Sequence, residues 1–230
     1  RVYELTPTER WTDTYFSPVT STNNADRRTR AFLFNPGSAD ITVTVTRSNN
    51  TTATVNVPAH GQGNYLFPSD LGAKFTSAGN PFYALQVITT PENNNDTSAS
   101  YNWGFSLIPE AYLAPMVVLG YAPGSSDLTQ NYSGVWIAPA ATTTIYVDRD
   151  GNTATGANTD ANGNKYDFSC AISALVPRII KDDGSSTCYT PSAYTGGKGT
   201  GDADMTGARI YTLDGTPLAA AWGQIPGLET

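Results

Sequence analysis

Two short runs of oxygen-bearing side chains are the strongest candidates for a functional site in this sequence. The runs Asp148–Asn152 and Asp160–Asn164 share one pattern, in which Asp or Asn occupies alternate positions and a glycine comes fourth. Oxygen donors at this spacing can converge when the glycine lets the backbone turn, and Ca²⁺ takes six to eight oxygen ligands at about 2.3–2.6 Å. The twin acidic turns therefore predict a structural calcium site.

The predicted ligands come from the twin turns and from two nearby acidic stretches. A helix–loop–helix calcium hand is excluded, because its glycine and glutamate positions hold Thr153 and Thr159 when counted from Asp148. The alternative is turn chemistry alone, because Asp-Gly and Asn-Gly are good turn formers without any ion. The candidate ligands are Asp148, Asp150, Asn152, Asp160, Asn162, Asn164, Asp167, Asp202 and Asp204.

Catalytic chemistry has few candidates. The single histidine, His60, lies in a Gly-rich turn, and no Gly-x-Ser-x-Gly elbow accompanies it. The two cysteines, Cys170 and Cys188, predict one disulfide in an oxidising compartment; two buried free thiols are the alternative. A disulfide would also remove both thiols from zinc binding and from nucleophilic catalysis. We therefore expect a protein that is not an enzyme.

The composition limits the kinds of partner that this chain is expected to bind. The chain has 230 residues, and its 13 basic and 20 acidic residues give a net charge of −7. Such a chain repels phosphate backbones, so we expect no nucleic-acid partner. No apolar run is long enough to span a membrane. Because the chain starts without a methionine or a signal-peptide pattern, we expect a fragment or processed product of a longer precursor.

The elements that must position the acidic turns are strands. Residues 40–46 and 54–58 alternate apolar and polar side chains around Asn49-Asn50, which predicts a hairpin. Longer apolar runs at 82–89 and 99–109 predict a second pair, and Asp214-Gly215 predicts a hairpin turn between 208–212 and 217–222. Ser69–Gly72 is the one expected helical turn. The remaining expected strands are 31–34, 64–67, 115–121, 134–139, 143–147 and 166–174.

Many short strands separated by Gly, Pro, Asn and Asp predict an all-β fold. We expect two tandem β-sandwiches, immunoglobulin-like or jelly-roll-like, comprising residues 1–112 and 113–230, because prolines flank residues 109–115 and the strand pattern restarts after them. A single continuous sandwich is the alternative.

Residues 100–224 carry a resemblance to a known family. They include Trp103–Pro109, Gly120–Ser125, Asp160–Asp167, Asp204–Thr212 and Ala221–Gln224. In this order they resemble large secreted bacterial surface proteins, which carry a module related to the N-terminal region of the IgG Fc-binding protein. Relatives tend to have an acidic residue after the Trp-Gly-Gln segment, where this chain has Ile225.

The resemblance implies a non-catalytic, adhesin-like module that is secreted to the cell surface. We expect its partner to be another protein or a second copy of the chain, as in a filament built by strand addition. The alternative is a carbohydrate-binding module, since four tryptophans and 13 tyrosines could stack on sugars. Trp103, Trp136 and Trp222 lie in expected strands and favour the core, whereas Trp11 is freer to lie on the surface.

Overall fold

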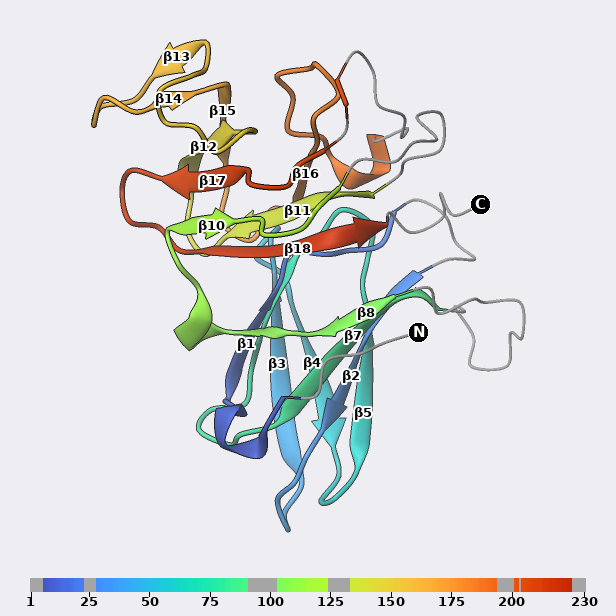
Figure 1. Cartoon of the computed structure of the whole chain (residues 1–230). Helices are drawn as coiled ribbons and strands as arrows, with labels where there is room; N and C mark the ends of the chain where they lie inside the picture. Colours follow the sequence, from blue (N-terminus) through green and yellow to red (C-terminus); the bar gives the residue numbers. More distant parts are fainter. Residues whose placement is uncertain are drawn as a thin grey trace.

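The strands form several antiparallel sheets that pack against one another, which confirms the predicted all-β sandwich fold (Figure 1). The computed structural model describes residues 6–22, 28–90, 103–123, 133–193, 201–202 and 204–224. In these ranges the only helical segments are three single 3-10 turns. These turns are η1 (Thr8–Arg10), η2 (Glu110–Tyr112) and η3 (Pro191–Ala193).

The first nine strands form two sheets, which we call the N-terminal sandwich. One sheet has the order β4-β3-β6-β1-β9 and the other β5-β2-β7-β8. Alternate side chains such as Val43, Val45 and Leu33 are fully buried in the core between the two sheets. The bounds are β1 (Thr14–Ser17), β2 (Arg28–Phe34), β3 (Ile41–Arg47), β4 (Thr52–Val57), β5 (Gln62–Leu66), β6 (Ala73–Thr76), β7 (Tyr83–Thr90), β8 (Gly104–Ser106) and β9 (Ile108–Pro109).

The other nine strands form the C-terminal sandwich. Its larger sheet has the order β10-β17-β12-β15 and its smaller sheet β16-β11-β18, and β13 and β14 pair by themselves. Ile137, Ile145 and Ile210 lie in its core. The bounds are β10 (Met116–Val118), β11 (Ser133–Pro139), β12 (Thr143–Asp148), β13 (Asn158–Thr159), β14 (Lys165–Tyr166), β15 (Phe168–Ile172), β16 (Arg178–Ile180), β17 (Arg209–Thr212) and β18 (Leu218–Gln224).

The two sandwiches lie one above the other, and β18 passes across the end of the N-terminal sandwich (Figure 1). Trp136 is fully buried where they meet and packs with Val19, Ile88 and Ile179. Among the described strands, no sheet contains strands from both sides of residues 110–115. The division into 1–112 and 113–230 as separate domains stays a prediction.

Three local expectations have clear outcomes. The hairpin around Asn49-Asn50 is confirmed, because β3 and β4 pair from Ile41↔Val57 to Thr46↔Thr52. The expected helical turn at 69–72 is wrong: Asp70 has a φ of 59°, which a right-handed helix does not allow. The Asp214-Gly215 turn forms, but β17 and β18 enter different sheets instead of pairing. Residues 99–102 of the expected 99–109 strand lie outside the described residues.

No helix in the described part of the chain is long and apolar enough to cross a membrane.

Candidate functional site

The twin acidic turns lie in the long connection between β12 and β15. These two strands pair from Thr143↔Ile172 to Val147↔Phe168, so residues 148–167 leave the sheet and return to it. Within the connection, β13 and β14 form a small hairpin with Asp160–Asn164 at its tip. The two pentads are thus the first turn of the connection and the tip of its hairpin.

The Asp160 turn folds onto tyrosines of the larger C-terminal sheet. Tyr146 of β12 stacks on Tyr211 of β17 with ring centroids 5.4 Å apart, and Tyr166 of β14 packs edge-on against Tyr146 at 5.0 Å. The Tyr211 hydroxyl donates a hydrogen bond of 2.8 Å to Asp160 Oδ2. The connection therefore covers the outer face of this sheet through an aromatic cluster.

The carboxylate of Asp160 is saturated with protein donors. Its Oδ1 accepts the backbone N–H groups of Asn162 and Asn164 at 2.8 and 2.9 Å, and Oδ2 also accepts from the Asn164 amide at 3.3 Å. Burial would raise the pKa of Asp160, but these bonds and the one from Tyr211 outweigh it and hold the pKa below its ordinary value. The ionised carboxylate is what organises this turn.

Asp148 at the end of β12 has a different partner. Its side chain is 1% exposed, and Oδ2 accepts from Arg209 Nε at 3.0 Å and Nη2 at 2.6 Å. Burial raises the pKa of Asp148, and Arg209 opposes the rise. A guanidinium therefore supplies the positive charge that this buried carboxylate requires.

Asp150 and Asp167 act on the backbone. Asp150 Oδ1 accepts the N–H of Asn152 at 2.8 Å, and Oδ2 accepts the Thr155 hydroxyl at 2.8 Å. The first of these bonds is the main reason that the pKa of Asp150 lies below its usual value. Asp167 Oδ2 accepts the N–H of Arg149 at 2.8 Å. Both carboxylates fix the path of the connection.

That Asp202 and Asp204 join the twin turns as ligands stays a prediction. The 205–207 loop does contact the first turn: a side chain at Gly151 would lie 2.3 Å from the Gly207 carbonyl. Asp204 Oδ1, however, accepts a hydrogen bond from the Thr206 N–H at 2.8 Å, and Asp202 Oδ1 accepts one from the Asp204 N–H at 2.9 Å. Each of the two carboxylates thus serves its own local turn.

Asp202 also lies beside Asp182, from the Asp182-Asp183-Gly184 stretch. Burial raises the pKa of Asp182 most, and the neighbouring Asp202 carboxyl raises it further. Arg149 Nε lies 3.4 Å from Asp182 Oδ1. No local sequence pattern predicts this grouping, because Asp182, Asp202 and Arg149 come from three separate loops.

Calcium binding by these residues stays a prediction. Among the described residues, no three or more His, Cys, Asp or Glu side chains are arranged as a metal-binding group. Asp160 points both oxygens at hydrogen-bond donors, and Asp148 points Oδ2 at a cationic side chain. A cation at either carboxylate would first have to displace these donors.

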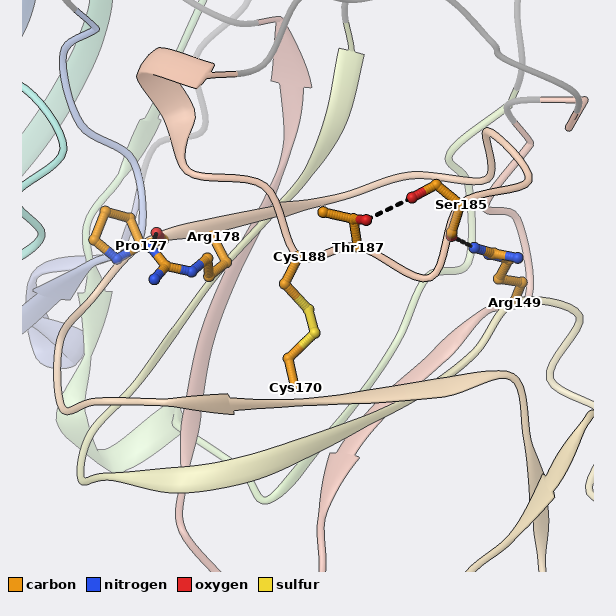
Figure 2. Close-up of a disulfide and its surroundings, with 7 residues drawn as sticks. All are labelled: Arg149, Cys170, Pro177, Arg178, Ser185, Thr187 and Cys188. Atoms are coloured by element: carbon orange, nitrogen blue, oxygen red, sulfur yellow. Dashed lines mark hydrogen bonds between the residues drawn. A yellow bond between two sulfur atoms is a disulfide. The ribbon is translucent and has the colours of Figure 1, made fainter.

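The predicted disulfide is confirmed. Cys170 of β15 and Cys188 are joined with an S–S length of 2.08 Å and a Cα–Cα distance of 6.4 Å. Figure 2 shows the bond tying the sheet to the loop that follows β16, where Arg149 donates to the Ser185 carbonyl and Ser185 Oγ donates to Thr187 Oγ1 at 2.6 Å. The disulfide and Arg149 thus hold the same loop at two points.

The burial of the four tryptophans differs in part from the expectation. Trp136 is buried as predicted, and Trp103 stacks on Phe105 with ring centroids 5.6 Å apart. Trp222 of β18 was expected in the core but is 37% exposed. Trp11, expected on the surface, is half-buried against Tyr83 at 5.3 Å.

Comparisons with known proteins add no family: no family model, no curated protein and no solved structure matches this chain. The fold and disulfide define the chain as a disulfide-bonded all-β protein of sandwich type. The resemblance to secreted bacterial surface proteins stays a prediction.

Proposed function

We propose that this chain is a non-catalytic structural or adhesive module that works outside the cell. The observation that carries the proposal is the interlocked contact between the two sandwiches. Trp136 is buried there, and the Ser192 backbone N–H of the C-terminal sandwich donates to Asp70 Oδ1 of the N-terminal sandwich at 2.8 Å. Two sandwiches fixed in this way hold their outer surfaces in one orientation, as a scaffold requires.

Close backbone approach supports the same proposal. A side chain at Gly72 would lie 2.1 Å from the carbonyl oxygen of Leu175, and one at Gly223 would lie 2.7 Å from the Trp103 ring. These contacts join residues far apart in the sequence. Such close packing opposes sliding of one sandwich on the other, because packed interiors deform little.

The disulfide supports the extracellular location. Disulfides persist in oxidising compartments and are rare in the reducing cytosol. The location is tested by alkylating thiols in freshly lysed cells of the native host, before and after reduction. We expect Cys170 and Cys188 to react only after the reductant is added. Alkylation of both thiols without reductant would contradict the proposal.

A carbohydrate-binding module is the second candidate, and one observation favours it. Tyr121 and Trp222 are 76% and 37% exposed, and their rings meet edge-on at 6.4 Å. Exposed aromatic faces are suited to stacking on sugars. Glycan-array binding lost in Trp222→Ala but kept in Trp11→Ala would support this candidate, and no binding to any glycan would contradict it.

A further inference from the structure

A small pocket lies on the outer face of the larger C-terminal sheet. Ile145 and Val147 of β12 point into the core, so Thr144 and Tyr146 between and beside them face outwards. The pocket has a volume of about 180 Å³. Pockets for drug-sized ligands measure about 300–1,000 Å³, so this one suits a ligand of a single ring. Its lining residues are Thr143, Thr144 and Tyr146 of β12, and Leu213 and Asp214 of the turn after β17.

The apolar part of the lining is held in place by the sheet itself. It consists of Tyr146 and Leu213. The Tyr146 ring stacks on Tyr211 with centroids 5.4 Å apart and meets the Tyr166 ring edge-on at 5.0 Å. These neighbours fix the orientation of the Tyr146 ring. A wall that is already ordered costs a ligand little conformational entropy on binding.

The charged part of the lining is a carboxylate that the turn also holds in place. Asp214 Oδ2 accepts the Thr143 hydroxyl at 2.7 Å, and Oδ1 accepts the Thr216 N–H at 2.9 Å. These bonds, that from Thr143 first, hold the pKa of Asp214 below its ordinary value, so the carboxylate is ionised at neutral pH. An ionised carboxylate has about four acceptor positions, which leaves Asp214 able to accept from a ligand.

Two hydroxyl groups complete the polar lining. Within the described part of the chain, the hydroxyls of Thr144 and Tyr146 hydrogen-bond to no other residue. A hydroxyl both donates and accepts. A ligand in the pocket can therefore bond to these groups without breaking a contact of the folded chain.

This lining fits one class of ligand best. The Asp214 carboxylate repels anions, which disfavours phosphates and acidic sugars. A purely apolar ligand would cover the carboxylate and the hydroxyls without bonding to them, at a cost in free energy. A neutral sugar ring has hydroxyls that can pair with Asp214 and Thr144, and it has C–H groups that can pack on Tyr146 and Leu213.

We propose that this pocket binds one neutral sugar ring, with its hydroxyls on Asp214 and Thr144 and its C–H groups on Tyr146 and Leu213. The inference goes beyond the scaffold function. The pocket also shares no lining residue with the exposed pair Tyr121 and Trp222.

A larger cavity in the N-terminal sandwich provides a contrast. Its volume is about 340 Å³, and it is lined by residues 35–41, Asn80 and Pro81. None of these residues is aromatic. Its one carboxylate, that of Asp40, accepts the Ala59 N–H at 2.9 Å. The combination of an ordered aromatic ring and a carboxylate is therefore a property of the smaller pocket.

The probes are the methyl glycosides of glucose, galactose, mannose and N-acetylglucosamine, titrated into the whole chain and followed through its backbone amide NMR signals. A ligand of about a dozen atoms binds weakly, so we expect a Kd on the order of 1 mM for at least one probe. The shifted signals should include Thr144, Leu213 and Asp214. Shifts confined to the surroundings of Trp222 would overturn the inference, as would no binding by any probe.

Two variants test the assigned contacts. Thr144→Val keeps the shape of the side chain and should weaken binding about fivefold, because it removes one hydrogen bond. Asp214→Asn should weaken binding at least about tenfold, because bonds to a charged acceptor are stronger. The matched control is Thr44→Val, at another half-buried threonine of a strand, which should leave the Kd unchanged. Equal effects of the two valine variants would overturn the inference.

An organic cation is the competing ligand class, since it could pair with Asp214 alone. Butylammonium chloride is its probe, and binding of butylammonium without binding of any glycoside would overturn the assignment to sugars. Circular dichroism checks that each variant folds, and Thr144→Val carries the test if Asp214→Asn does not fold. The scaffold function stands under either result, because its own test is the redox state of Cys170 and Cys188.

Discussion

At the scale of single residues, several of the candidate Asp ligands serve backbone geometry. Asp150, Asp160 and Asp204 each accept a backbone N–H two residues further on. This is the hydrogen bond by which Asp stabilises tight turns. What separates Asp160 from the other two is the Tyr211 hydroxyl, which connects its turn to the sheet.

Asp160 should therefore matter more for stability than its counterpart in the first turn. Removing a buried carboxylate that accepts several bonds costs about 2 kcal/mol, so we expect Asp160→Ala to lower the free energy of unfolding by about that amount. Asp150→Ala, at an exposed position, should cost less than about 1 kcal/mol. Urea denaturation measures both, and equal losses would contradict the role of Tyr211.

The same carboxylate makes stability depend on pH. Its pKa is lower in the folded state than in the unfolded state, so its contribution is present above the unfolded value of about 3.9. The contribution is lost as the pH falls from there through the folded pKa. Asp160→Asn should lack this part of the acid destabilisation. The measurement is the midpoint of urea unfolding against pH for both proteins.

Lys181 makes stability depend on pH in the same direction, but in the alkaline range. Burial lowers its pKa to about 8, although Asp183 counteracts the shift, and the residue is 1% exposed. Between pH 8 and the unfolded value of about 10.4 the unfolded chain binds more protons, so this group makes stability rise with pH. We expect that rise to disappear in Lys181→Met. An unchanged slope in urea titrations from pH 8 to 10 would contradict the assignment.

Calcium is tested at this scale as well. A bound ion would stabilise the folded chain and raise its melting temperature, by an amount that grows with the logarithm of the ion concentration above the dissociation constant. Adding excess chelator, and then excess calcium, should move the melting temperature in opposite directions if the twin turns bind the ion. An unchanged melting temperature would remove calcium from the description and leave turn chemistry as the whole account.

At the scale of elements, the connection between β12 and β15 and the loop after β16 are secured by different means. The connection is held by tyrosine packing and Asp160, whereas the loop is held by the disulfide and Arg149. Arg149 also lies over the Phe168 ring at 4.9 Å, at the start of β15. The two segments therefore share Arg149.

Breaking the disulfide should destabilise the C-terminal sandwich. The cysteines are 18 residues apart, and closing a loop of this size stabilises a protein by about 3 kcal/mol. We expect a lower melting temperature under reducing conditions. The Cys170→Ala/Cys188→Ala protein serves as the control, since the reductant should not affect it. If the reductant lowers both melting temperatures equally, the disulfide is not the cause.

At the scale of the whole molecule, stability depends on how closely the two sandwiches approach. Gly72 has no room for a side chain, because its backbone faces Leu175 of the other sandwich. Asp70, two residues earlier, accepts the Ser192 N–H across the same boundary. The region around Gly72 is therefore where one added atom affects both halves.

Gly72→Ala should destabilise the chain by about 1–3 kcal/mol, since overpacking forces the backbone to move. Gly120→Ala is the matched control, because a side chain there meets nothing within 4 Å. Thermal unfolding should show a clear drop for the first and almost none for the second. Equal melting temperatures would contradict the close contact.

The sequence by itself determined the all-β class, the hairpin of β3 and β4, and the cysteine pairing. Period-two patterns and two cysteines 18 residues apart are local signals, which can be interpreted without knowing the order of the strands. Only the tertiary structure decided the partners of the acidic turns. Arg209 and Tyr211 reach Asp148 and Asp160 across about 50 to 60 residues, and the contacts follow from strand order. The route from β17 into a different sheet at β18 was decided in the same way, because an Asp-Gly turn fixes a reversal of the chain but not which strand it will pair with.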